Sequence, residues 1–296
     1  MGLPDDDGRP AGRPLAGRVC VVTGASSGIG KAASLALARL GATMVLVCRD
    51  QARGQSALAD VAAAAGGAGS AGPPMLELAD LSSLDQVRDL ARRLGARPRI
   101  DVLVNNAGLV VGHRRLTADG LEWTFAVNHL APFLLTNLLR TRLAASAPAR
   151  VVTVASTAHH GASLDLADLQ AERRYLPMLA YANSKLANIL FTRELARKLD
   201  GTGITANCLH PGTVATGFGH SGSRALRLGL TIARPFLRSA EAGASTVAYL
   251  ASSPEVAGRS GGYYVGRKLR APSRAARDDA LAHDLWEVSA RLTGIG

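Results

Sequence analysis

Tyr181 and Lys185 are the side chains of this sequence with the clearest capacity for chemistry, and they stand four residues apart. On a helix, that spacing puts both on one face. A phenol with a pKa of about 10 is a poor acid or base at neutral pH, but a neighbouring ammonium favours the phenolate and lowers that pKa. Tyr181 can then give a proton to a carbonyl oxygen or take one from an alcohol. Ser156, at the end of a predicted strand, can hydrogen-bond the same oxygen.

A glycine-rich turn, TGASSGIGK, follows the apolar run at 18–23. Glycines allow a tight turn and let a phosphate group approach the first N–H groups of the next helix, whose dipole favours anions. The pattern predicts a pyrophosphate site of a dinucleotide; an ordinary strand–helix turn is the structural alternative. The residues expected to line this site are Gly24, Ser26, Ser27, Gly28, Ile29 and Gly30.

Short β-branched runs alternate with longer Ala/Leu-rich segments from Arg18 onward. Strands are expected at 18–23, 42–48, 75–78, 100–105, 150–156 and 203–210, and helices near 28–40, 50–65, 82–94, 117–144 and 179–200. Continuous apolar strands that alternate with helices indicate a parallel sheet covered on both faces. The predicted fold class is therefore α/β, a doubly wound Rossmann-type sheet.

One domain is expected over 17–296, after a disordered segment at 1–16. The alternation of strands and helices lapses after Gly212 and resumes near Ala240. An irregular segment of that length is typical of a lid, which we place at about 213–238, after the sixth strand. Residues of about 267–296 form a C-terminal extension. The Gly-rich stretch at 65–74 is expected to be a surface loop.

Five motifs then occur in a fixed order: TGxxxGxG, Asn105-Asn106-Ala107-Gly108, Ser156, Tyr181-x-x-x-Lys185 and Pro211-Gly212. In this order and spacing they resemble the short-chain dehydrogenase/reductase family, over about 18–265. The segments VNHLAPFLLT, ASTAHH, YANSKLANILF and LWEVSARL resemble its retinol dehydrogenase-like branch. The resemblance implies an oxidoreductase that moves a hydride between a nicotinamide cofactor and a carbonyl or alcohol, and a homo-oligomer.

The resemblance also implies roles for further residues. Asn128 matches an Asn that holds a water linking the Lys to solvent, so the catalytic set is Tyr181, Lys185, Ser156 and Asn128. Lys185 also holds the ribose of the cofactor. Asp80 matches an adenine-contacting residue, although it could simply belong to a helix start. Beside the glycine turn, Tyr181 and Lys185, the expected cofactor-binding residues are Arg49, Asp80, Leu81, Asn106, Ala107, Gly108, Pro211, Gly212, Val214 and Thr216.

The cofactor preference depends on Cys48-Arg49-Asp50 at the end of the second strand. An NAD enzyme places a carboxylate there for the ribose 2′-OH. If the critical position is Cys48, no acid competes, and Arg49 can pair with the 2′-phosphate of NADP. If the register slips by two residues, Asp50 favours NAD. Because Asp50 also suits the cap of the next helix, we expect NADP(H) over NAD(H).

His159 and His160, close to Ser156, could suggest a metal site or a catalytic triad. No Cys or carboxylate spacing completes a metal site, so no metal is expected, and the pair is interpreted as loop residues near the substrate mouth. Cys20, Cys48 and Cys208 lie in apolar strand-like runs and form no CxxC pair, which favours reduced, buried thiols and a soluble, cytoplasmic protein.

The net charge of +11 is concentrated between residues 221 and 277, which hold ten Lys/Arg and two acids. No nucleic-acid motif accompanies them, so nucleic acid is not an expected partner. The arginines at 221–238 could form a solvated face, meet an anionic or carrier-bound substrate, or touch an anionic membrane. The expected partner is a small carbonyl or alcohol, apolar or bulky. The alternative function is a catalytically quiet dinucleotide-sensing or binding protein on the same fold.

Overall fold

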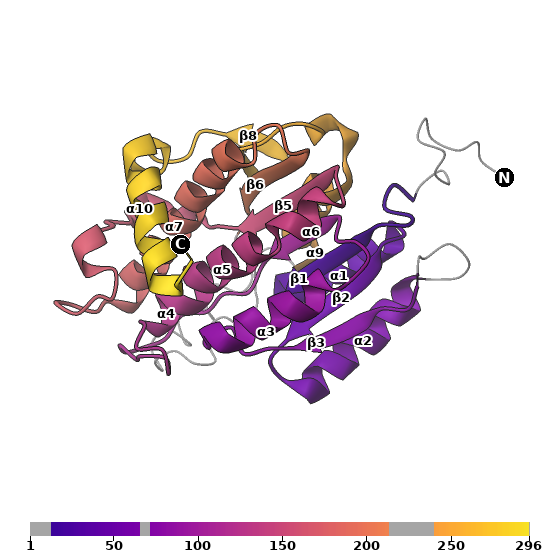
Figure 1. Cartoon of the computed structure of the whole chain (residues 1–296), viewed down its shortest axis with the longest axis horizontal. Helices are drawn as coiled ribbons and strands as arrows, with labels where there is room; N and C mark the ends of the chain where they lie inside the picture. The colour runs from indigo at the N-terminus through magenta and orange to yellow at the C-terminus, as the bar shows by residue number, and fades with distance from the viewer. Residues whose placement is uncertain (1–12, 66–71, 213–239, 296) are drawn as a thin grey trace.

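The computed structural model describes residues 13–65, 72–212 and 240–295, and its centre is a single mixed sheet (Figure 1). The strands lie side by side in the order β3-β2-β1-β4-β5-β6-β7-β8. They are β1 (Val19–Thr23), β2 (Thr43–Cys48), β3 (Met75–Leu78), β4 (Val102–Asn105), β5 (Ala149–Val154), β6 (Ile204–His210), β7 (Tyr263–Val265) and β8 (Lys268–Arg270). All neighbouring strands are parallel except β8, which runs antiparallel to β7. This is the doubly wound α/β sheet that the sequence predicts.

Helices cover both faces of the sheet. One hydrophobic core lies beneath α1 (Gly28–Arg39), α2 (Gln51–Ala65) and α9 (Ala240–Ser252). The other lies beneath α3 (Leu84–Gly95), α5 (Ala131–Leu138) and α7 (Pro177–Lys198), and α10 (Asp279–Thr293) packs on the outside of α7. Successive strand residues alternate between the cores: Cys20 and Val22 enter the first and Val21 enters the second.

The prediction of one long helix at 117–144 is wrong, because the helical segment begins later and is divided. The helical segment begins at Trp123 and consists of α4 (Trp123–Phe125), a π-helical turn η1 (Ala126–Leu130), α5 and α6 (Arg140–Ala144). Gly120 has φ +75°, which no helix tolerates, and the Glu122 carboxylate accepts the N–H groups of Thr124 and Phe125 as the N-cap. Pro132 has no N–H to donate to the carbonyl of Asn128, so an α-helical ladder cannot continue there.

Residues 13–16, which the sequence analysis assigns to a disordered segment, are part of the fold. Leu15 is buried in the core under α1, and its N–H donates to the Leu40 carbonyl over 3.0 Å. Its apolar side chain fixes the approach to β1. The three cysteines are free thiols and all are buried, as expected. Most of the Gly-rich loop, 66–71, lies outside the described residues.

The C-terminal part extends the sheet beyond the expected strands. β7 and β8 form a hairpin whose turn residues, Gly266 and Arg267, both have positive φ. The chain then passes through 271–274 to the one-turn helix η6 (Ala275–Arg277) and into α10. Asp278 caps α10 by accepting the N–H of Leu281. The described part of the expected C-terminal extension, 267–295, is therefore built into the sheet and onto α7.

Candidate active site

The strands from β1 to β7 are parallel, so their carboxyl ends meet at one edge of the sheet. The winding reverses between β1 and β4, which are neighbours in the sheet although β2 and β3 lie between them in the chain. Ligands of doubly wound sheets bind at the carboxyl edge at this reversal. The sequence-predicted site residues in the described chain follow these strand ends, begin α1, or lie on α7 and η1.

The glycine turn after β1 has the geometry that an anion requires. Gly24 and Gly28 have φ of +67° and +55°, and a Cβ on Gly30 would lie 2.3 Å from the carbonyl oxygen of Gly24. Only glycine fits these positions. Ser27 is the N-cap residue of α1 but makes no side-chain cap hydrogen bond, and the first turn holds no acidic residue. The first N–H groups of this helix can therefore receive a pyrophosphate, with Ser26 and Ile29 beside them in the chain.

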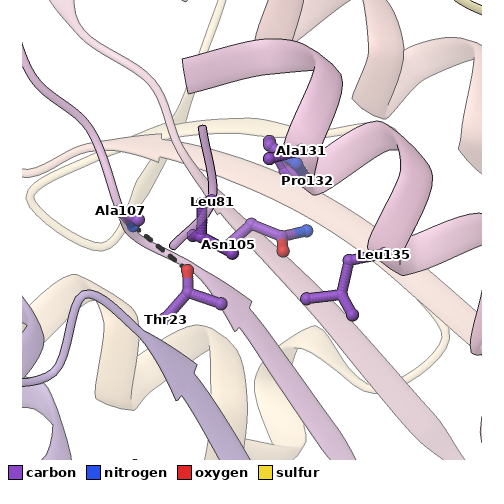
Figure 2. Close-up of a pocket in the computed structure, with 7 residues that line it drawn as sticks. All are labelled: Thr23, Leu81, Asn105, Ala107, Ala131, Pro132 and Leu135. Atoms are coloured by element: carbon purple, nitrogen blue, oxygen red, sulfur yellow. Dashed lines mark hydrogen bonds between the residues drawn. The ribbon is translucent and has the colours of Figure 1, made fainter. Parts of the chain in front are cut away.

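Thr23 and Asn106 join the glycine turn to the segment after β4. The Thr23 hydroxyl accepts the N–H groups of Asn106 and Ala107 over 3.0 and 3.1 Å, and Asn106 Nδ2 donates to the Thr23 carbonyl over 2.8 Å. Figure 2 shows the Thr23–Ala107 bond at the rim of a small cavity. Its lining residues are Thr23, Leu81, Asn105, Ala107, Ala131, Pro132 and Leu135. Thr23 was absent from the sequence-predicted set, and its role is visible only once β1 and β4 are known to be neighbours.

Asp80 shapes the turn between β3 and α3. Its Oδ1 accepts the N–H and the hydroxyl of Ser82 over 3.0 and 2.8 Å, while Ser83 is the N-cap of α3. One carboxylate oxygen is thus used to form the entry to the helix, which was the alternative interpretation of this residue. Leu81 is buried and lines the cavity of Figure 2, beside the position expected for adenine.

Arg49 and Asp50 follow β2 and differ in what they contact. Asp50 Oδ1 accepts the N–H of Arg53 over 2.8 Å at the start of α2, as expected for a helix cap. Within the part of the chain that the structure describes, the exposed guanidinium of Arg49 has neither an ion pair nor a hydrogen bond. Cys48, the last residue of β2, is buried. Among the described residues, the Arg49 guanidinium thus has no hydrogen-bond partner, whereas the Asp50 carboxylate caps α2.

Tyr181, Lys185 and Ser156 come together at the carboxyl end of β5. Lys185 Nζ lies 5.6 Å from the centre of the Tyr181 ring and donates to the Val154 carbonyl over 3.0 Å. Ser156 follows β5, and its hydrogen bond to the Tyr181 phenol favours the phenolate. A Cβ on Gly108 would lie 3.2 Å from Lys185 Nζ, so the backbone after β4 closely approaches the ammonium. Three of the four predicted catalytic residues are thus assembled in one place.

Burial dominates the titration of this pair. It raises the pKa of Tyr181 to about 12 and lowers the pKa of Lys185 to about 8. The expected lowering of the Tyr181 pKa by Lys185 is not seen in the protein alone. At neutral pH the phenol therefore carries its proton, which is the form that can protonate a carbonyl oxygen.

Asn128 lies on the π-helical turn and is fully buried. Its Oδ1 accepts the N–H of Leu109 over 2.8 Å, and its Nδ2 donates to the Leu109 carbonyl over 2.9 Å and to the Ser184 hydroxyl over 3.0 Å. The side chain thus fixes the segment that follows Gly108 against α7. Asn128 lies inside the π turn, in which the Ala131 N–H donates to the Ala126 carbonyl five residues earlier.

Of the expected cofactor-binding residues after β6, two lie in the part of the chain that the structure describes and two lie outside it. Pro211 is buried at the end of β6, and Gly212 has φ +86°. Val214, Thr216 and the expected lid at 213–238 lie outside the described residues. In residues 13–65, 72–212 and 240–295, no group of three His, Cys, Asp or Glu could hold a metal ion. No described helix is long and apolar enough to cross a membrane.

A glycine turn at the first strand, a cavity at the winding reversal and an adjacent Tyr–Lys–Ser group define a nicotinamide dinucleotide-binding oxidoreductase of the Rossmann type. The sequence model of the short chain dehydrogenase family matches residues 18–226. Mouse retinol dehydrogenase 14 is 42% identical over 289 residues, which cover 94% of this chain and 86% of the mouse protein. The chain belongs to the short-chain dehydrogenase family.

Solved structures of other proteins share the fold. A protein from Mycobacterium paratuberculosis is 36% identical with a TM-score of 0.75, and the match covers 95% of this chain and 94% of that one. A short chain dehydrogenase from Burkholderia cenocepacia in complex with NADP is 27% identical with a TM-score of 0.66, covering 84% and 96% of the two chains. The family match and the curated relatives support NAD(P)-dependent oxidoreductase activity on a small-molecule substrate.

Proposed function

We propose that this protein interconverts a carbonyl and an alcohol on an apolar or bulky substrate, with NADP(H) as the preferred cofactor and Tyr181 as the acid/base. The observation that carries the proposal is the assembly of Tyr181, Lys185 and Ser156 at the carboxyl end of β5. When bound, the nicotinamide supplies or accepts the hydride. The Ser156 hydroxyl holds the reacting oxygen, and the Tyr181 phenol gives it a proton.

The protonation states support reduction of the carbonyl. A phenol with a pKa of about 12 is protonated at neutral pH and can donate without a prior proton uptake. Lys185, with a pKa of about 8, carries a positive charge over most of the neutral range. That charge attracts ribose hydroxyl oxygens and stabilises the phenolate left after the proton has moved. Asn128 supports this group by fixing the backbone that follows Gly108.

The preference for NADP(H) rests on Arg49. Its exposed guanidinium has no ionic partner among the described residues, and Asp50 is held by the N–H of Arg53. A guanidinium can bind a 2′-phosphate by two parallel charge-assisted hydrogen bonds. The pyrophosphate would lie at the glycine turn, and the adenine side near Asp80 and Leu81. Val214 and Thr216, after β6, are proposed to contact the nicotinamide amide.

The name of one relative supports the proposed substrate class. Retinol dehydrogenase 14 of mouse carries retinol in its name, and we propose an apolar aldehyde or ketone of comparable bulk for this chain. The arginines of the lid segment would meet any anionic group on that substrate. A homo-oligomer stays a prediction from the family resemblance.

A panel of carbonyl compounds tests the proposal. Hexanal, decanal, all-trans-retinal and a bulky aryl ketone are each incubated with NADPH and, separately, with NADH, while the nicotinamide absorbance is followed. We expect turnover of at least one apolar carbonyl, faster with NADPH. Tight NADPH binding without turnover of any compound would favour a dinucleotide-sensing protein instead.

A further inference from the structure

His159 is buried at the centre of the one-turn helix η2 (Thr157–Gly161), three residues after Ser156. Its side chain is only 1% exposed, although its neighbour His160 is exposed. Nδ1 lies 2.6 Å from the Ser156 carbonyl oxygen, and Nε2 lies 3.1 Å from the backbone nitrogen of Ser273. One imidazole ring thus joins the carboxyl end of β5 to the segment that follows β8.

These two contacts allow a single protonation state. A backbone N–H can only donate, so Nε2 must present its lone pair to Ser273. The proton of the neutral ring is then on Nδ1, where it meets the Ser156 carbonyl oxygen. A doubly protonated ring would set two N–H groups against each other at Ser273. Burial of the ring and the nearby His160 also lower the pKa of His159, which favours the same neutral form.

Two aromatic side chains pack against the His159 ring. Tyr263 on β7 meets the His159 ring edge-on at a centroid distance of 5.2 Å, and the His160 ring lies at 4.1 Å.

Ser156 has an extended backbone, and its carbonyl also accepts the N–H of His159 over 3.3 Å. The same residue's hydroxyl accepts the N–H of Ala158 over 3.2 Å. The peptide plane and the hydroxyl of Ser156 are therefore both set by the η2 turn.

We propose that His159 is a positioning residue for Ser156: its Nδ1–H holds the Ser156 carbonyl, and Ser273 fixes the ring through Nε2, so that the Ser156 hydroxyl stays directed at the reacting oxygen and at Tyr181. This inference rests on the proposed role of Ser156 in carbonyl reduction. It gives the C-terminal segment a function in the active site, because Ser273 lies in the part of the chain that follows β8. It also assigns a role to a histidine that the sequence analysis interpreted as a loop residue.

Two amide substitutions separate the two contacts of the ring. In His159→Asn the Nδ2 group occupies the place of Nδ1 and can still donate to the Ser156 carbonyl. In His159→Gln the longer side chain places its amide near Nε2, where its oxygen can accept from Ser273 but the donor to Ser156 is lost. His283→Gln, at an exposed histidine on α10, is the matched control.

Kinetics with the best carbonyl of the panel give the first result. We expect His159→Gln to lower kcat by about 10- to 100-fold with KM little changed, because small displacements of a catalytic group have costs of this size. His159→Asn is expected to retain most of kcat, and His283→Gln all of it. In Ser156→Ala the further change His159→Gln should have little effect, since residues that act as a unit are not additive. If kcat of the double variant were lowered by the product of the two single losses, the two residues would act independently and the proposal would be overturned.

A second measurement needs no turnover, so it separates this inference from the proposed function. Nitrogen-15 NMR of the imidazoles in the wild-type protein should show His159 protonated at Nδ1 from pH 8 down to pH 6. Exchange of the Ala158 amide, which reports the Ser156 hydroxyl, should accelerate in His159→Gln and not in His159→Asn. An Nε2-protonated His159 in the wild type, or equal exchange in both variants, would overturn the proposal even if the carbonyl panel succeeds. If no carbonyl of the panel is turned over, the imidazole NMR and the Ala158 amide exchange still test the positioning role of His159.

Discussion

At the scale of single residues, the account depends on a protonated phenol that is held between a hydroxyl and an ammonium. The spacing of Tyr181 and Lys185 predicted that they share a helix face, and the structure places Ser156 with them at the end of β5. The sequence could not predict how strongly burial acts on each group. Because burial raises the Tyr181 pKa and lowers the Lys185 pKa, the pair at neutral pH is a protonated phenol beside a cation that titrates near pH 8.

Removing the phenol of Tyr181 tests its role as the proton donor. In Tyr181→Phe we expect kcat for carbonyl reduction to fall by about 10²- to 10⁴-fold, the usual size of general acid–base catalysis. The affinity for NADPH, measured by fluorescence titration, should be unchanged. Tyr175→Phe is the control, because the Tyr175 hydroxyl donates to the Val111 carbonyl and is no part of the Tyr–Lys–Ser group. Near-normal turnover in Tyr181→Phe would remove Tyr181 from the mechanism.

Arg49 carries the proposed preference for the phosphorylated cofactor. We expect Arg49→Ala to weaken NADPH binding by about 1.5–3 kcal/mol, the value of a hydrogen bond to a charged group, and to leave NADH binding unchanged. Dissociation constants of both cofactors are measured for wild type and variant. Arg39→Ala, at the exposed last residue of α1, controls for the loss of a positive charge. An equal loss for both cofactors would assign Arg49 a purely structural role.

At the scale of elements, the strands were predictable and the helical segment after β4 was not. Continuous apolar runs such as 42–48 are typical of strands that are buried on both faces of a parallel sheet. The segment 117–144 has a helical composition throughout, but Gly120, the Glu122 cap and Pro132 divide it locally. The resulting π turn carries Asn128 and His129. β7 and β8 were missed because three-residue strands carry almost no periodic signal and depend on their pairing with β6.

His129 links three of these elements and should make stability depend on pH. Its Nε2 lies 2.9 Å from the Ser289 hydroxyl on α10, and its Nδ1 lies 3.4 Å from Asn188 Oδ1 on α7. Burial among Phe125, Phe133 and other aromatic rings lowers its pKa from 6.5 to about 4. Between these values the unfolded chain binds a proton that the folded protein does not, so stability falls as the pH falls from about 6.5 towards 4.

Chemical denaturation at pH 7 and pH 5 measures this effect. The His129 contribution to the free energy of unfolding should drop by about 2 kcal/mol between these two pH values. His129→Gln keeps a polar side chain at the position but does not titrate. Between pH 7 and pH 5 the free energy of unfolding of this variant should therefore fall by about 2 kcal/mol less than that of the wild type. Parallel pH dependences for wild type and His129→Gln would show that His129 titrates normally in the folded protein.

At the scale of the whole molecule, the order of the strands determines which residues meet. Thr23, Leu81, Asn106 and Pro132 are far apart in the sequence, yet all lie at or beside the cavity at the winding reversal (Figure 2). The sequence predicted the family motifs that mark this region, because each motif is local. It could not predict contacts such as His159 with Ser273, which require the C-terminal segment to return along β7 and β8.

The central claim is that the whole assembly transfers a hydride from the nicotinamide to a carbonyl carbon while the protein supplies the proton. The most direct measurement uses NADPH carrying deuterium at either C4 position, together with the best carbonyl of the panel, and mass spectrometry of the alcohol. The account predicts that one of the two labelled forms yields alcohol with one deuterium on carbon, at a rate equal to NADPH consumption. Alcohol free of deuterium with both forms, or NADPH consumption without alcohol, would contradict it.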